Sequence, residues 1–239
     1  DYGIMTGKAR VNPVTPLRGV VEKRPVQHRK ALGREQLPDF LRKLEAATNI
    51  NAVTKAAAWL QVLTFLRPGE LRHGLWDEIK WQKREWHIPQ SRTHPYTGEN
   101  MLGMKMREPH VVPLSDQVLS ILKDLKRLTG ERAFIFPGHH DYRKPLSEGA
   151  VLASIKKRLG YPVTAHGFRA VARTVLDEEL GFRADYIEHQ LHHAVRDPNG
   201  RAYNRTTYLK QRHEMMQTWA DFIFNLKDSA NVVAIRKAR

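Results

Sequence analysis

Residues 164–203 read TAHGFRAVARTVLDEELGFRADYIEHQLHHAVRDPNGRAY and carry the most informative side chains of the chain. A threonine in front of apolar residues with helical spacing is a typical N-cap, so Thr164 predicts a helix that begins at Ala165. His166 and Arg169 are three residues apart and would share one face near the N-terminus of that helix. A helix N-terminus favours an anion, and an arginine beside a histidine makes a phosphate the expected ligand. A lone pair of this kind is more often a surface ion pair, so the interpretation depends on the rest of the sequence.

Composition and charge point to a nucleic-acid partner. The 239 residues include 40 Lys and Arg against 25 Asp and Glu, which gives a net charge of +15 and a pI near 10.2. A hydrophobic content of 41% is typical of a soluble globular protein, and basic residues spread along the whole chain indicate a polyanionic ligand. The sequence shows neither a membrane-spanning stretch nor a signal peptide, so we expect a cytoplasmic protein. The absence of cysteine excludes disulfides, thiolate nucleophiles and Cys-based zinc sites.

Hydrophobic periodicity predicts one folded domain with less regular ends. Residues 1–33 are rich in Gly, Pro and basic residues, so we expect a linker or the remnant of a preceding domain there. The domain is expected at 34–226, followed by a tail at 227–239. We expect helices at 34–47, 51–66, 115–128, 147–159, 165–180, 184–192 and 207–226, and strands near 79–81, 85–88 and 110–113. The predicted fold is therefore of the α+β class, mainly α-helical, with a small antiparallel β-sheet inserted after the second helix.

The first half of the chain adds two basic side chains. Arg67 ends an apolar helix and precedes Pro68, which suits the first position of a new helical turn, so Arg67 would lie at a fixed corner between two helices. An ion pair with Glu70 alone would explain Arg67 equally well. Lys105 comes shortly before the strand-like run 110–113 and could lie near a hairpin tip, although a solvated side chain is the simpler interpretation of a single lysine.

Seven short motifs appear in an order that resembles a known family. They are RPGELR at 67–72, WDEI at 76–79, PHVVPLS at 109–115, HGFR at 166–169, QLHH at 190–193, AYNR at 202–205 and MMQTWAD at 215–221. This order resembles the catalytic domain of the tyrosine recombinases, in particular the integrases of prophages and genomic islands. Each motif alone is weak, but together, from about residue 34 to about residue 226, they are specific.

The resemblance implies a DNA breaking and rejoining enzyme with six catalytic residues. The family's two phosphate-binding arginines fall on Arg67 and Arg169, its hairpin lysine on Lys105, its proton-transfer histidine on His166, its phosphate-binding histidine on His193 and its nucleophile on Tyr203. Tyr203 would attack phosphorus and form a 3′-phosphotyrosine, while Lys105 protonates the departing 5′-oxygen. Because this bond conserves the energy of the phosphodiester, no cofactor, ATP or metal is expected.

The same resemblance implies the partners. The substrate would be double-stranded DNA at attachment sites, and the enzyme would work with other protomers in a tetrameric synaptic complex that integrates or excises a mobile element. The helix at 207–226 and the tail beyond it are expected to contact a neighbouring protomer, since the run VVAI at 232–235 offers an apolar patch. Neither a membrane nor a small-molecule substrate is expected.

Two departures from the family pattern leave alternatives open. His192 stands where Gly or Ala is common, so His192 and His193 compete for one role, and the spacing from Leu191 favours His193. Tyr203 follows His193 by ten residues, one more than in many relatives. Tyr208 is therefore a second candidate nucleophile, although a packing role for its ring is favoured.

Three other interpretations compete with a recombinase. A DNA-binding module of the same fold that has lost its chemistry is the alternative function, and the complete set of six side chains argues against it. A metal-dependent nuclease would need Asp and Glu near the basic site, whereas the acidic run 177–179 resembles a solvated helix face. A metal site built from His189, His192 and His193 lacks a suitably spaced carboxylate or cysteine.

Overall fold

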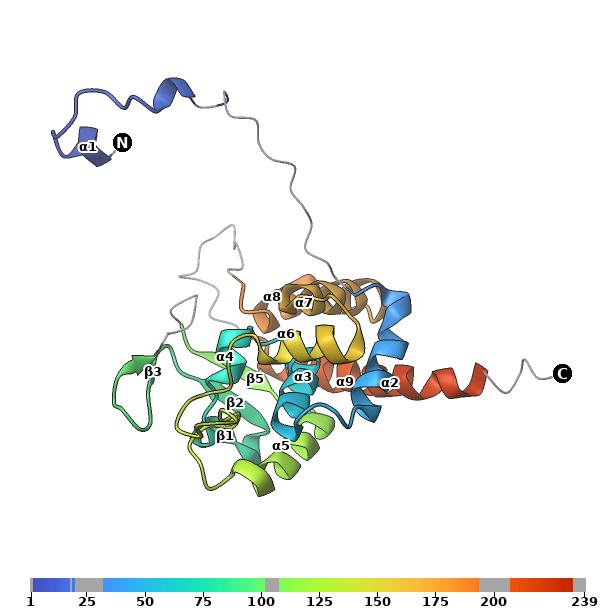
Figure 1. Cartoon of the computed structure of the whole chain (residues 1–239). Helices are drawn as coiled ribbons and strands as arrows, with labels where there is room; N and C mark the ends of the chain where they lie inside the picture. Colours follow the sequence, from blue (N-terminus) through green and yellow to red (C-terminus); the bar gives the residue numbers. More distant parts are fainter. Residues whose placement is uncertain (1, 18, 20–31, 102–107, 194–206, 234–239) are drawn as a thin grey trace.

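The computed structural model describes residues 2–17, 19, 32–101, 108–193 and 207–233 (Figure 1). The α-helices are α1 (Tyr2–Met5), α2 (Leu37–Ala46), α3 (Ala52–Thr64), α4 (Pro68–Arg72), α5 (Asp116–Thr129), α6 (Ala150–Ser154), α7 (Ala165–Thr174), α8 (Ala184–Gln190) and α9 (Leu209–Val233). The strands are β1 (Ile79–Lys80), β2 (Glu85–Ile88), β3 (Arg92–Thr93), β4 (Asn100–Met101) and β5 (His110–Pro113). Single π-helical turns extend α6 to Leu159 and α7 to Glu179. The mainly helical architecture with a small antiparallel sheet confirms the predicted fold class.

Helix α3 lies at the centre of the helical layer. Asn51 caps it by accepting a hydrogen bond from the backbone N–H of Val53 at 2.9 Å. Its side chains are buried almost all round, as expected for a helix that is surrounded by others. In Figure 1, α3 lies among α5, α6, α7 and α9, and it contacts all four. The helix ends at Thr64, and its C-cap residue Phe65 has a left-handed backbone with φ at 62°.

The sheet is ordered β1, β2, β5, with both pairings antiparallel. Trp86 on the central strand β2 is fully buried and lies opposite Val112 of β5. Its ring packs so closely on Gly74 that a Cβ atom at that position would come within 2.3 Å of it. Gly74 therefore allows the turn after α4 to lie directly on the sheet, and this places α4 beside β2.

A second ladder was not expected. Strands β3 and β4 pair antiparallel, with Arg92 opposite Met101, in a region for which the sequence predicted no strand. Strands of two residues are too short to produce an alternating hydrophobic pattern, which explains why the sequence did not reveal them. This hairpin leads directly into the segment that contains Lys105, which lies outside the described residues.

The helix starts predicted near Ser115 and at Ala165 are confirmed, whereas the helices expected from residues 34, 147 and 207 begin as α-helices at Leu37, Ala150 and Leu209, and the predicted end of the last helix is wrong. Ser115 caps α5, and Thr164 caps α7 by accepting from the N–H of Gly167 at 3.1 Å. Helix α9 was expected to end at Leu226 but continues to Val233, because no Gly or Pro interrupts residues 207–233. In Figure 1 its C-terminal part projects beyond α2. The division of the chain at residues 33 and 226 stays a prediction.

Candidate active site

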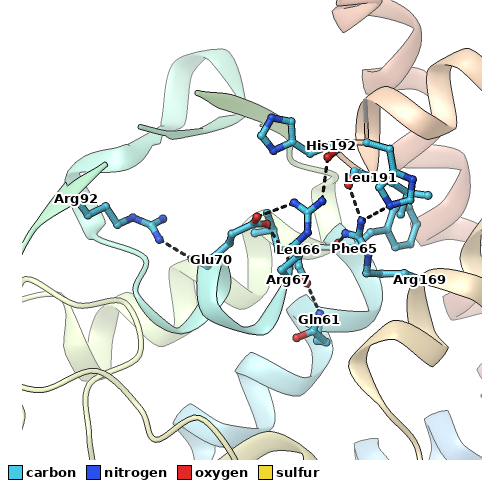
Figure 2. Close-up of polar contacts among 10 residues, drawn as sticks. Gln61, Phe65, Leu66, Arg67, Glu70, Arg92, Arg169, Leu191 and His192 are labelled. Atoms are coloured by element: carbon cyan, nitrogen blue, oxygen red, sulfur yellow. Dashed lines mark hydrogen bonds and ion pairs between the residues drawn. The ribbon is translucent and has the colours of Figure 1, made fainter. Parts of the chain in front are cut away.

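Arg67 lies at the corner between α3 and α4, as the sequence predicted, with Pro68 as the first residue of α4. Its Nη1 donates to Oε1 of Glu70 at 2.8 Å, and its backbone N–H donates to Oε2 of the same carboxylate at 3.1 Å. Its Nη2 donates to the carbonyl oxygen of His192 at 2.9 Å (Figure 2). The ion pair with Glu70 is thus present, but the guanidinium also reaches a segment 125 residues away. Arg67 therefore joins α4 to the loop after α8.

Arg169 approaches the same loop from the second turn of α7. The residue is 7% exposed, and its guanidinium donates to the carbonyl oxygens of Phe65 and Leu191 (Figure 2). Its Nη2 also lies 3.0 Å from Nε2 of His193. Burial, followed by the positive charge of Arg67, lowers the pKa of Arg169 to about 10. This lowering of the pKa means that the charged form of Arg169 is destabilised by roughly 3 kcal/mol in the folded protein, and a bound anion would offset that cost.

His193 follows α8 and makes a second contact on its other side. Its Nδ1 lies 2.6 Å from Oε2 of Glu188, and Oε1 of this carboxylate accepts from Nε of Arg173 at 2.8 Å. Burial alone would raise the pKa of Glu188, but the hydrogen bonds from Arg173 and His193 outweigh it and hold this pKa below its usual value. Glu188 therefore stays ionised and orients the ring of His193.

The His192 ring has different surroundings from its neighbour. It stacks on the ring of His110, with centroids 4.4 Å apart and an angle of 19° between the planes. Nδ1 of His192 and Nε2 of His110 are buried and have no hydrogen-bond partner among the described residues. It is therefore the ring of His193, and the backbone carbonyl of His192, that contact the two arginines. The geometry supports the assignment to His193, whose role stays a prediction.

Two left-handed residues aim carbonyl groups at the arginines. Phe65 and His192 have φ values of 62° and 51°, a conformation that non-glycine residues adopt at a cost of order 1–3 kcal/mol. The Phe65 carbonyl accepts from Arg169, and the His192 carbonyl accepts from Arg67. Strain of this kind is typical of functional sites. Neither position is a glycine, so the left-handed backbone at these residues could not be predicted from the sequence.

Of the other three predicted catalytic residues, His166, Lys105 and Tyr203, the structure describes only His166. His166 is exposed on the first turn of α7, one turn before Arg169, as the HxxR spacing predicted. Lys105 and Tyr203 lie outside the described residues, so their placement and roles stay predictions. The structure therefore brings Arg67, Arg169 and His193 together, with His166 on the helix that carries Arg169.

Tyr208, the competing nucleophile, has its ring packed against other side chains. Its ring centroid is 4.9 Å from that of Tyr186 and 5.4 Å from that of His189. The guanidinium of Arg183 lies 5.9 Å from the same ring. These contacts agree with the predicted packing role of Tyr208.

A buried brace beneath the site was missed by sequence reasoning. Arg212 of α9 is 3% exposed and donates twice to Oε1 of Gln190, at 3.0 and 2.7 Å, and once to the carbonyl of Val111 at 2.6 Å. Nε2 of Gln190 in turn donates to the carbonyl of Thr64 at 3.1 Å. These contacts tie α9, α8, α3 and β5 together at Thr64 and Gln190, the residues just before Phe65 and Leu191, whose carbonyls accept from Arg169. The sequence offered one signal for this brace: Arg212 and Gln190 are polar residues at positions where their helices would be expected to bury apolar side chains.

The competing metal-dependent interpretations find no support in the described part of the chain. No group of three or more His, Cys, Asp or Glu side chains there could hold a metal ion. Asp177, Glu178 and Glu179 are exposed, as predicted, and Glu179 pairs with Arg34 at 2.7 Å.

Among the described helices, none is long and apolar enough to cross a membrane.

Comparison with known proteins shows the family to which the chain is similar. Residues 30–209 match the phage integrase family. The chain is 37% identical over 228 residues to the integrase of Enterobacteria phage P4, covering 93% of this chain and 52% of that protein. It is 37% identical over 233 residues to the prophage integrase IntA of Escherichia coli K12, covering 97% of this chain and 53% of that protein. The chain thus spans about half the length of these curated relatives.

Solved structures share the fold. The Tn1549 transposon integrase in complex with a circular intermediate DNA aligns with a TM-score of 0.64 and 16% identity, over 91% of this chain and 74% of the other. The integrase of mycobacterium phage Brujita aligns with a TM-score of 0.58 and 19% identity, over 90% of this chain and 66% of the other. The fold is thus that of tyrosine recombinase catalytic domains. By sequence, the chain belongs to the phage integrase family.

Proposed function

We propose that this chain is the catalytic part of a site-specific DNA recombinase that cuts and rejoins double-stranded DNA at attachment sites, and so integrates or excises a mobile element. The observation that carries the proposal is the convergence of Arg67, Arg169 and His193 on one position, where two like charges are held close together. Arg67 also pairs with Glu70, but a guanidinium carries several donors, so a phosphodiester between the two arginines would offer both of them further anionic oxygens.

The proposed reaction proceeds through a covalent intermediate. The phenol oxygen of Tyr203 attacks phosphorus, His166 takes the phenol proton, and Lys105 gives a proton to the 5′-oxygen as its bond to phosphorus breaks. Arg67 and Arg169 grip the non-bridging oxygens, and His193 donates a further hydrogen bond to them. The products are a 3′-phosphotyrosine and a free 5′-hydroxyl. Reversal with a different 5′-hydroxyl joins new strands, without a metal, ATP or another cofactor.

Assembly and location follow from this proposal. Strand exchange between two duplexes needs four active sites, so the working unit would be a tetramer on DNA, and the protein would act on DNA in the bacterial cytoplasm. Helix α9 projects beyond the helical layer and is the element that we expect to contact a neighbouring protomer (Figure 1). Deletion of residues 228–239 should then weaken synaptic complexes in the longest natural form of the protein, as gel filtration with DNA would measure.

The test of the chemistry is a trapped intermediate. A nicked duplex taken from the boundary of the genomic element that encodes the chain loses its short 5′-fragment after cleavage, so the adduct cannot be resealed. We expect an adduct that survives SDS and maps to Tyr203, equally in the presence of EDTA. Loss of the adduct on chelation would favour the nuclease, and DNA binding without an adduct would favour the inactive DNA-binding module.

Binding itself should depend strongly on salt. Each neutralised phosphate contributes about −0.9 to the slope of log affinity against log salt concentration, and a net charge of +15 provides many such contacts. Fluorescence anisotropy at several salt concentrations measures this slope. An affinity that does not change with salt would contradict a phosphate-binding surface.

A further inference from the structure

Glu70 is held through its backbone as well as through its side chain. Its carboxylate accepts from the backbone N–H and from Nη1 of Arg67, as described above. Its carbonyl oxygen accepts from Nη1 of Arg92 at 2.8 Å (Figure 2). Glu70 therefore connects Arg92 to Arg67: its carbonyl accepts from Arg92, and its carboxylate accepts from Arg67.

Arg92 is itself fixed by a buried, forked ion pair. Its Nε and Nη2 donate to Oε1 and Oε2 of Glu78 at 2.7 and 2.8 Å, and the two side chains are 4% and 6% exposed. Nε1 of Trp86 donates to the same Oε2 at 2.8 Å. A buried pair of this kind keeps its geometry only when its hydrogen bonds are complete, and these bonds fix the plane of the guanidinium. The remaining Nη1 is thereby aimed at Glu70.

Arg92 also stands where two parts of the proposed site meet in the sequence. It begins β3, whose partner β4 ends at Met101, four residues before Lys105. Helix α4, which carries Glu70, starts directly after Arg67. Arg92 thus connects the β3–β4 hairpin, which precedes Lys105, to helix α4, which follows Arg67. A change at Arg92 can therefore alter the position of Lys105 or that of Arg67.

We propose that Arg92 is a positioning residue for the phosphate clamp: by holding the Glu70 carbonyl, it fixes α4 and so the guanidinium of Arg67. This inference rests on the proposed function, and it assigns the effect of Arg92 to Arg67 and not to Lys105. The described hydrogen bonds of the Arg92 guanidinium go to Glu78 and to the Glu70 carbonyl, so we assign its effect on cleavage to Glu70.

The first experiment compares matched lysine variants. Arg92→Lys keeps a positive charge opposite Glu78 but cannot also reach the Glu70 carbonyl, whereas Arg34→Lys makes the same change in an exposed forked pair with Glu179. We expect Arg92→Lys to slow adduct formation at saturating nicked DNA on the order of 10- to 100-fold, with DNA affinity nearly unchanged. Arg34→Lys should stay within about twofold of the unchanged chain. Equal rates for Arg92→Lys and the unchanged chain overturn the proposal.

A modified substrate separates the two possible targets of Arg92. Sulfur in place of the 5′-bridging oxygen makes a leaving group that needs no proton, so it restores cleavage when only proton donation is impaired. We expect no such rescue of Arg92→Lys. We also expect Arg92→Lys to add little to the defect of Arg67→Lys, because both act on one clamp. Rescue by sulfur, or fully additive defects, would assign Arg92 to the Lys105 side and contradict the proposal.

A measurement without DNA tests the positioning independently of catalysis. The amide of Arg67 and those of α4 should exchange hydrogen faster in Arg92→Lys and in Arg92→Gln, while the amides of α7 keep their protection. Unchanged exchange at 67–72 overturns the proposal, even if the chain forms no adduct. Absence of an adduct from the unchanged chain, by contrast, counts against the proposed function and leaves this exchange result to decide on Arg92.

Discussion

Nη2 of Arg169 lies 3.0 Å from Nε2 of His193, and this contact determines which ring nitrogen carries the proton. A guanidinium only donates, so Nε2 accepts, and the proton lies on Nδ1, which donates to Glu188 at 2.6 Å. A phosphate oxygen between the two side chains would accept from both, which requires a second proton on Nε2. Glu188 is placed to balance the resulting positive charge.

The two adjacent histidines should differ sharply when each is replaced. If His193 binds the phosphate as proposed, His193→Ala removes a hydrogen bond to a charged group, and we expect a loss of about 1.5–3 kcal/mol of transition-state stabilisation in adduct formation. His192→Gly keeps the carbonyl that binds Arg67 and suits the left-handed backbone at φ 51°, so it should retain most of the activity. Single-turnover cleavage of nicked DNA measures both. The reverse ranking would transfer the phosphate contact to His192.

Arg67→Lys should be severely impaired although the charge is kept. A lysine cannot donate to Glu70 and to the His192 carbonyl and also grip two phosphate oxygens. We expect a loss on the order of 2–4 kcal/mol, seen in the rate constant at saturating DNA. Cleavage close to that of the unchanged chain would reduce Arg67 to a structural partner of Glu70.

The two candidate nucleophiles can be separated by removing one oxygen from each. Tyr203→Phe should abolish the covalent adduct while DNA affinity and the thermal midpoint stay nearly unchanged. Tyr208→Phe keeps the ring that packs on Tyr186 and should leave cleavage largely intact. Peptide mapping of the trapped adduct provides the measurement. An adduct on Tyr208 would contradict the alignment of the last motif and weaken the assignment of His193.

Stability should fall in mildly acidic solution because of His110. Burial, followed by the positive charges of Arg212, His192, Arg67 and Arg169, holds the pKa of His110 well below its usual 6.5. Below that pH the unfolded chain binds a proton that the folded chain does not, so stability is lost as the pH falls. For one proton, the free energy of unfolding falls by at most about 1.4 kcal/mol per unit of pH.

The pH effect is checked by urea unfolding from about pH 5 to pH 8, the range in which histidine titrates. His110→Phe keeps a flat ring against His192 and should show a shallower decline, with His192 accounting for part of what remains, since burial lowers its pKa as well. Identical slopes for the variant and the unchanged chain would contradict the role of His110.

The sequence alone determined the local features of this protein. The side chains of Ser115 and Thr164 cap their helices by accepting from the backbone N–H three residues ahead, so these caps can be predicted from neighbouring residues. The corner at Arg67 follows from Pro68 for the same reason. The long apolar and amphipathic periods indicated the helical fold, whereas the end of α9 was misjudged because no residue there stops a helix.

Only the tertiary structure decided how the distant side chains combine. The pairing of Arg169 with His193, the Arg92 contact with Glu70 and the Arg212 brace join residues between 22 and 126 positions apart. Such contacts depend on which helices and strands pack together, whereas hydrophobic periodicity indicates only which face of each element is buried. The left-handed carbonyls of Phe65 and His192 belong here too, because their conformations persist only while the surrounding contacts hold them.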